Sequence, residues 1–589
     1  MTDNWNLDDI YAGFDSPEFM SDFESLTADI DKMNNMAGAL GSFADVVALI
    51  RTLEEYTKKT DRMASYANFV FTTDTANSDA TKYLYLIESL DAETSRTQVR
   101  MAAFLSKLDD LPRLAKEHDI EHYTYQITHM AEEYAHLLSE DEETIIALMS
   151  STGSSAWRML QEKLTSVLTC EYADPKDGGK TRTININECR NLAYDKNPDV
   201  RKAAFEAEIA SYPKISEAAA FALNSIKGEV NLISRLRKFD SPLCQTLFDS
   251  AMSKPTLDAM FQAIESNIQC LRDYLKAKAK YLNKPNGLPF YDLFAPVGNS
   301  AKTFTYEDAK KFVAENLGKF SPRMGETAQK AYDNNWIDVY PKEGKVSGAY
   351  CGDIYPIKQF RVLLNYGNNL SDAITLAHEL GHGYHSMQVM EEGILNSNYP
   401  MPLAETASTF CEAIVTSAAL ADETLPDEEK LQIIENSLQD ATQVILDIYS
   451  RYLFEKSVFD ARLNHPLSVQ ELNDMMLNAQ RTAYGDGLDH SALHPYMWVI
   501  KPHYYSAHVS YYNFPYAFGH LLANGLYKIY EKDPTNFGEK YDSFLRASGK
   551  MPIKESCSLL GIDVENVDFW NDAIGVVLGN IEKFRGLVG

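Results

Sequence analysis

One five-residue segment, HELGH at residues 378–382, constrains this chain more than any other feature. On an α-helix, His378 and His382 lie one turn apart, so both imidazoles project from the same face. Neutral imidazole is a favoured zinc ligand, and two at this spacing form one edge of a tetrahedral site. Glu379 lies beside the first ligand and can take the proton as metal-activated water attacks a carbonyl. The segment therefore predicts a zinc-bearing helix; the alternative is an ordinary buried helix with two hydrogen-bonded histidines.

The surroundings of the segment favour a helix next to a small sheet. The run AITLAHELGHGYHSM is amphipathic over more than three turns, and Ser371 or Asp372 can cap its beginning. Just before it, residues 343–367 are rich in glycine, β-branched and aromatic residues and contain the apolar run Phe360–Leu364. This pattern predicts a loop and short strands whose edge could hold an extended substrate.

A catalytic zinc ion usually has a third protein ligand, and five residues are candidates: His385, Glu391, Glu392, Glu405 and Glu412. His385 lies a further turn along the helix, and three such histidines span about 10 Å, so we interpret it as a pocket residue. Glu391 and Glu392 suit a solvated helix end. Glu405 and Glu412 lie in the apolar helical run PLAETASTFCEAIVTSAALA, about 10 Å apart on one face, so only one can bind directly. The spacing leaves that choice open.

The rest of the chain reads mostly as amphipathic helices. The segment TSVLTCEYADPKDGGKTRTINI is an exception, because its β-rich flanks surround a proline and two glycines and predict a hairpin near residues 165–186. A length of 589 residues exceeds what one core usually organises. We expect an N-terminal helical domain over residues 1–195 and a catalytic domain over residues 196–589.

Composition excludes several classes of partner. The formal net charge of −29 repels phosphate backbones and acidic membrane surfaces, so nucleic acid is not an expected partner. The chain has no apolar run long enough for a transmembrane helix, and its first residues show no secretory signal. Its seven cysteines are scattered and form no CxxC. We therefore expect a cytoplasmic protein.

Four segments together resemble the oligoendopeptidase F branch of the thimet oligopeptidase family of zinc peptidases. They are SGAYCG, VLLNYGNNLSDAITLAHELGHGYHS, PLAETASTFCE and WVIKPHYYSAHVSYYNFPYAFG. The N-terminal half is similar as well, in NWNLDDIYAGFDSPEF, SYANFVFTTDT and STGSSAWRMLQEKLTS. The resemblance covers nearly the whole chain and implies a mostly helical, two-lobed shell around a deep substrate channel.

The resemblance also implies site residues. The resemblance implies that His378, His382 and Glu405 hold one Zn²⁺ and that Glu379 is the general base. It also implies cleavage of internal bonds in short, unstructured oligopeptides. It further supplies a late histidine and tyrosines that stabilise the oxyanion, a role that amide hydrolysis requires. His503 matches the late histidine.

The matching tyrosines are harder to align, because the segment after His503 is about two residues longer than usual in the branch. Tyr512 is the best match and Tyr516 the next, ahead of Tyr511, Tyr505 and His508; packing in the core is the alternative for each tyrosine. Phe514 stands where the branch often has tyrosine.

Two other functions compete with endopeptidase activity. A dipeptidyl carboxypeptidase or carboxypeptidase on a similar shell would need a cationic clamp for the substrate's C-terminus, which the sequence does not reveal. An inactive peptide-binding protein would be expected to have lost Glu379 or a ligand, yet all are present.

Overall fold

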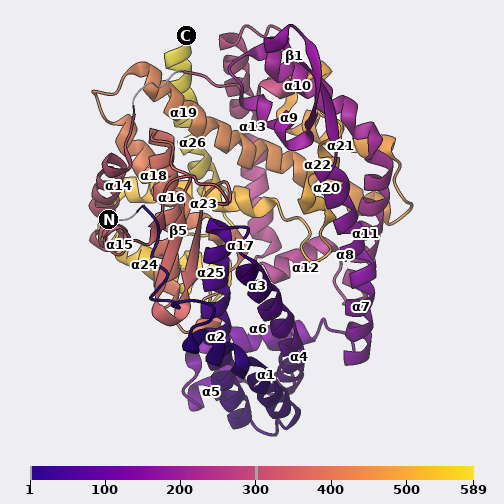
Figure 1. Ribbon diagram of the computed structural model, residues 1–589, viewed down its shortest axis with the longest axis vertical. Coiled ribbons are helices and arrows are strands. Elements are labelled where there is room, and N and C mark those ends of the chain that lie inside the picture. The colour runs from indigo at the N-terminus through magenta and orange to yellow at the C-terminus, as the bar shows by residue number, and fades with distance from the viewer. Residues whose placement is uncertain (1–2, 299–302) are drawn as a thin grey trace. The chain divides into compact units, whose positions relative to one another are not determined.

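The computed structural model (Figure 1) describes residues 3–298 and 303–589. The chain divides into two compact units. Each unit combines three separate stretches of chain. The first unit contains Met1–Leu137, Lys302–Ala421 and Ile529–Ile562. The second unit contains Leu138–Ala301, Asp422–Lys528 and Asp563–Gly589.

The first unit is built from helices and one small sheet. Its helices are α1 Pro17–Gly38, α2 Phe43–Thr73, α3 Ser78–Asp91, α4 Ser95–Leu105, α5 Leu111–Glu117, α6 Thr124–Tyr134, α14 Tyr306–Phe320, α15 Pro322–Asp333, α16 Leu370–Val389, α17 Met401–Ala404, α18 Thr406–Leu420, α24 Phe537–Ala547 and α25 Ile553–Ser558. Its strands are β3 Ile337–Asp338, β4 Tyr350–Ile354 and β5 Gln359–Leu363.

The second unit is helical apart from one hairpin. Its helices are α7 Glu140–Thr152, α8 Ser154–Ser166, α9 Ile186–Asn191, α10 Pro198–Ser211, α11 Ser216–Leu236, α12 Pro242–Asp249, α13 Lys254–Tyr281, α19 Asp427–Thr442, α20 Ile448–Arg462, α21 Val469–Tyr484, α22 Met497–Ile500, most of α23 Phe514–Lys532, and α26 Val567–Val588. A π-helical turn, Gln443–Asp447, joins α19 to α20. Its strands are β1 Thr169–Asp174 and β2 Lys180–Asn185.

The predicted mostly α class is confirmed. The predicted hairpin is present as well: β1 and β2 pair antiparallel, with Cys170 opposite Ile184. Local sequence signals also place helix starts correctly. Thr305 and Asp308 form a capping box at the start of α14, because each side chain satisfies the backbone N–H of the other.

The expected domain boundary at residue 195 does not coincide with the two units. Residues 138–195 belong to the second unit, where side chains of α7 and α8 contact α11. The Oε2 atom of Glu143 lies 2.6 Å from Nη2 of Arg237, and the hydroxyl of Ser154 donates to Glu229 at 2.6 Å. These contacts join residues far apart in the chain, so local periodicity could not reveal them.

The three-stranded sheet has the order β3-β5-β4, which leaves β4 as an edge strand. β4 pairs antiparallel with β5, and β3 pairs parallel with it. On one face, Gly352 packs closely on Phe69 of α2. On the other, Phe360 of β5 packs on Gly383 of α16. The predicted small sheet beside the HELGH helix is therefore confirmed.

Within the described residues, no helix combines the length and apolar character needed to cross a lipid bilayer.

Candidate metal centre

Helix α16 carries the HELGH segment and begins about two turns before it. Its N-cap is Asn369, whose side chain accepts a hydrogen bond from the backbone N–H of Asp372 at 3.0 Å. Asp372 returns the interaction by accepting from the backbone N–H of Asn369 at 3.2 Å. The expected cap at Ser371 or Asp372 is therefore corrected by two to three residues, since Asp372 is the third helical residue of a capping box.

Three ligand atoms converge on one point beside α16. His378 Nε2 and His382 Nε2 are 3.1 Å apart, and Oε2 of Glu405 lies 3.4 Å from the first and 3.5 Å from the second. A tetrahedral zinc ion with bonds of roughly 2.0–2.1 Å separates its ligand atoms by roughly 3.3–3.4 Å. The two imidazoles and the carboxylate therefore fit the donor types and spacing that zinc requires.

Glu412 contacts the imidazole of His378 on the side opposite to Glu405. Nδ1 of His378 donates to Oε1 of Glu412 at 2.7 Å, so this glutamate fixes the ring and leaves Nε2 facing Glu405. The sequence places Glu405 and Glu412 on one helix, but the structure ends α17 at Ala404 and begins α18 at Thr406. Glu405 sits at the break, where its side chain turns toward the histidines and accepts from Ser408 Oγ at 2.9 Å.

Glycine at position 381 allows α16 and α18 to approach this closely. A Cβ atom there would lie 2.6 Å from the backbone oxygen of Ala407 and 2.7 Å from Cα of Ser408, distances that real Cβ atoms do not tolerate. This close approach was not predicted from the sequence. The glycine inside the helical pattern was the available signal, because such a residue often marks a close backbone approach.

The charges around the centre favour a cation. Burial lowers the pKa of His378, but the hydrogen bond to Glu412 and the charges of the surrounding glutamates together outweigh burial and raise that pKa to about 9. Burial raises the pKa of Glu405, whereas the hydrogen bond and charge of His382 lower it to about 2. The carboxylates thus stabilise positive charge at the place where the ligand atoms converge.

Glu379 lies within the same cluster, with a carboxylate oxygen within 4.8 Å of ligand atoms on His378 and His382. Its side chain is 5% exposed, and its Oε2 is buried without a hydrogen-bond partner among the described residues. Burial raises the pKa of this carboxyl. The charges of the two histidines lower it, but by less, so the pKa stays above its usual value. A buried carboxylate with an unused oxygen beside three ligand atoms is suited to accept a proton.

The remaining ligand candidates are engaged elsewhere. His385 is fully buried, lies 2.8 Å from Ser548 Oγ through its Nε2, and stacks on Tyr399 at a centroid distance of 4.0 Å. Burial lowers its pKa to about 3, so the ring is neutral. Glu391 pairs with Lys358 at 3.1 Å, and Glu392 pairs with Lys550.

The edge strand β4 passes close to the centre. Burial raises the pKa of the Cys351 thiol well above its usual value, and the nearby charge of Glu379 raises it further. A thiol in this state is protonated and a poor nucleophile.

The late histidine and tyrosines cluster in the second unit, whereas the HELGH helix belongs to the first. The rings of His503 and Tyr512 stack at a centroid distance of 4.7 Å, and Tyr512 meets Tyr516 edge-on at 5.8 Å. All three side chains are partly exposed. Burial, together with the charges of nearby cations, lowers the pKa of His503 to about 4, so it is a neutral hydrogen-bond donor near pH 7.

The other aromatic candidates occupy different environments. Tyr505 and Tyr511 are 0% and 4% exposed, and Tyr511 stacks on Phe459 at 5.4 Å, so both are core residues. His508 is exposed, and Phe514 is buried. Among the four candidate tyrosines, Tyr512 and Tyr516 are therefore the two with partly exposed side chains.

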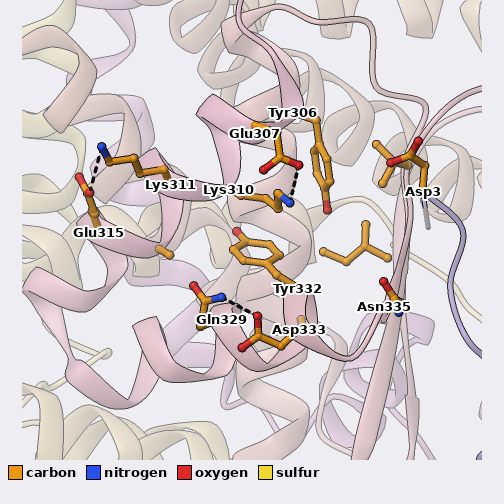
Figure 2. A pocket seen from close by; sticks show the side chains of 14 residues that line it. Asp3, Tyr306, Glu307, Lys310, Lys311, Glu315, Gln329, Tyr332, Asp333 and Asn335 are labelled. Carbon is orange, nitrogen blue, oxygen red and sulfur yellow. Dashed lines mark hydrogen bonds and ion pairs between the residues drawn. The ribbon is translucent and has the colours of Figure 1, made fainter. Parts of the chain in front are cut away.

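A cavity of about 560 Å³ in the first unit, shown in Figure 2, contains none of the predicted site residues. Several of its polar side chains pair with neighbours along their own helices. Lys310 lies 2.6 Å from Glu307, and Gln329 donates to Asp333 at 2.8 Å. Groups that satisfy one another in this way do not converge on a reacting atom, so the cavity lacks the arrangement of a catalytic centre.

Peptidase family M3 matches residues 191–576, and oligopeptidase F matches residues 108–169. The chain is 25% identical over 565 residues to oligopeptidase PepF of Bacillus subtilis, covering 94% of this chain and 82% of that one. It is 24% identical over 596 residues to group B oligopeptidase PepB of Streptococcus agalactiae, covering 99% and 97% of the two chains.

Solved structures show the same fold. A crystal structure from Chlamydophila abortus superposes with a TM-score of 0.82 at 21% identity, covering 99% of this chain and 98% of that one. Oligoendopeptidase F from Enterococcus faecium gives a TM-score of 0.73 at 19% identity, covering 97% and 99%. The family match spans well over half of the chain and confirms the resemblance inferred from its motifs. The chain belongs to peptidase family M3, in its oligoendopeptidase F branch.

Proposed function

We propose that this protein is a zinc-dependent endopeptidase that hydrolyses internal bonds of short, unstructured oligopeptides. The observation that carries the proposal is the convergence of His378 Nε2, His382 Nε2 and Glu405 Oε2 within 3.1–3.5 Å of one another. When bound by these residues, zinc supplies a Lewis acid that makes water a better nucleophile at neutral pH and polarises the scissile carbonyl.

The chain's own residues then have distinct tasks. Glu379 accepts the proton of the attacking water and returns it to the leaving amine, a role that its buried, unpaired oxygen supports. Glu412 holds the imidazole of His378 through Nδ1, and Ser408 holds the carboxylate of Glu405. These contacts keep the ligands oriented throughout the reaction.

Substrate backbone is proposed to pair with the outer edge of β4, the strand that ends the sheet beside α16. Pairing through main-chain groups accepts many side chains, which suits an enzyme acting on varied peptides. Since neither peptide terminus takes part in such pairing, internal bonds of end-blocked peptides should be cleaved.

His503, Tyr512 and Tyr516 are proposed to stabilise the negative charge that develops on the carbonyl oxygen. Tyr512→Phe should lower turnover by about 10²–10³, the usual effect of losing one donor to an oxyanion, and leave zinc content unchanged. His503→Ala should act in the same direction. Tyr511→Phe is the matched control, since that ring packs in the core. Unchanged turnover in Tyr512→Phe, together with strongly reduced turnover in Tyr511→Phe, would show that the alignment of this segment is wrong by one residue.

Substrate length provides the test of the proposed function. We expect cleavage of flexible peptides from roughly six to twenty residues, because ordering a longer chain inside an enclosed site costs more conformational entropy. The measurement is mass spectrometry of the products from a ladder of peptides blocked at both ends, beside reduced casein. Digestion of casein as fast as ten-residue peptides would refute an enclosed site. Complete loss of cleavage after blocking the C-terminus alone would favour a carboxypeptidase.

A further inference from the structure

A second cavity, of about 400 Å³, lies within the second unit and plays no part in the proposed catalysis. Segments far apart in the chain enclose it, including α9, α10 and the residues around α22. Its volume falls in the range of pockets for small molecules. Aromatic rings form much of its wall: Tyr194, Phe205, Phe290, Tyr291, Phe294 and Tyr484.

The arginines at this cavity already have carboxylate partners. Nε of Arg201 lies 2.7 Å from Oδ1 of Asp292, and both side chains are almost fully buried. Arg190 pairs with Glu208. Arg451, just behind the cavity wall, pairs with Asp447 and donates to Asn513.

The acids that line the cavity are likewise engaged. Besides Arg190, Glu208 accepts from Tyr212 at 2.7 Å and interacts with His494 Nε2 at 3.1 Å. Besides its arginine, Asp447 accepts from Gln443 and Tyr484. Asp440 also has an interaction partner. Each of these described carboxylates therefore already has an interaction partner.

Among the described residues that line the cavity, Lys501 is the cation for which no ion pair is seen. Its side chain lines the cavity, and within residues 3–298 and 303–589 its ammonium makes no hydrogen bond or ion pair. Burial and the charge of Arg451 lower its pKa to about 7, while Asp447 and Glu208 act in the opposite direction from a distance. Lys501 is partly buried, so its ammonium has lost some of its hydration without gaining a counter-ion, and a bound anion would offset that loss.

We propose that this cavity binds a carboxylate attached to an apolar side chain, such as a C-terminal amino acid of a peptide, with the ammonium of Lys501 as partner of the carboxylate. The aromatic wall suits an apolar or aromatic side chain better than a strongly hydrated anion such as phosphate. Peptide C-termini and free amino acids share this chemistry. The proposal requires no catalysis, so it stands or falls independently of the endopeptidase function.

Isothermal titration calorimetry on zinc-loaded Glu379→Gln protein tests the proposal without turnover. N-acetyl-L-phenylalanine is the probe, and its amide, N-acetyl-L-phenylalaninamide, is the matched control. We expect the acid to bind at least about tenfold more tightly than the amide, the change that follows from losing one charged hydrogen bond. Inorganic phosphate should bind more weakly than the aromatic acid. Ala-Ala-Phe with a free or amidated C-terminus then shows whether a peptide terminus binds as well as the single amino acid derivative.

Variants at Lys501 locate the binding. Lys501→Met keeps the length of the side chain and should weaken binding of the acid at least about tenfold, whereas Lys501→Arg should retain it. Tyr194 is 60% exposed, so Tyr194→Ser removes part of the wall with little risk to folding and should weaken binding several-fold. Circular dichroism confirms that each variant is folded.

The pH dependence separates an ammonium partner from a packing role. Only the protonated amine pairs with a carboxylate, so affinity should be highest below pH 7 and fall as pH rises through about 7. The Lys501→Arg variant should show no such fall. Equal affinity of Lys501→Met and its parent, equal binding of acid and amide, or phosphate binding as tightly as the aromatic acid would each overturn the proposal.

Discussion

Glu379→Gln is expected to lower peptide hydrolysis by about 10²–10⁴-fold or more while the protein keeps its zinc. The amide has nearly the same shape as the carboxylate but cannot accept the proton of the attacking water. Glu379 supplies none of the three converging ligand atoms, so metal binding should persist. Turnover of a blocked peptide and zinc content by atomic absorption are measured on the same preparation.

Glu391→Gln is the matched control for this change. It removes the same charge from a glutamate on the surface that pairs with Lys358, and it should leave turnover within about twofold of the wild type, as surface changes usually do. Activity of Glu379→Gln within tenfold of the wild type would exclude Glu379 as the general base. Loss of zinc from that variant would instead indicate that its carboxylate binds the metal.

The second large effect concerns the two glutamates after the HELGH helix. Glu405→Ala should weaken zinc binding at least about 100-fold, because it removes one of the converging ligand atoms. Glu412→Ala should weaken it only about tenfold, because that residue orients His378 through Nδ1. Competition with a chelator of known affinity measures both constants.

Glu412→Gln refines this comparison. Its amide oxygen can still accept the hydrogen bond from His378 Nδ1, so this variant should bind zinc more tightly than Glu412→Ala. Equal losses at positions 405 and 412, or a larger loss at 412, would mean that the proposed ligand and its supporting residue must be exchanged. Because chelator competition needs no substrate, its outcome is separate from any change in turnover.

Features set by neighbouring residues in the chain were predictable. The helix at residues 378–382, the hairpin near 165–186 and the cap at Thr305 all follow from patterns within a few residues. Repeating apolar positions and capping side chains act over one or two turns, so the sequence displays them directly. The small sheet before α16 was predictable for the same reason.

Boundaries between compact units were not predictable in this way. The expected division at residue 195 assumed that neighbouring segments stay together, yet residues 302–421 join residues 1–137 in one unit. The buried pair of Arg361 with Asp9, 2.6 Å apart, is one contact behind this arrangement, and it spans 352 positions. Such pairs depend on how elements pack, and local composition carries little trace of them.

By itself, the sequence determined the class of chemistry, because two histidines and a glutamate at helical spacing leave few roles other than a metal centre. Only the tertiary structure decided where the carboxylates of Glu405 and Glu412 lie relative to His378. Helical spacing put Glu405 and Glu412 on one face and left the choice open, whereas the break at Glu405 and the glycine at 381 bring one carboxylate to each side of His378. The physical reason is range: helix periodicity is local, but the approach of α18 to α16 depends on backbone packing between two separate segments.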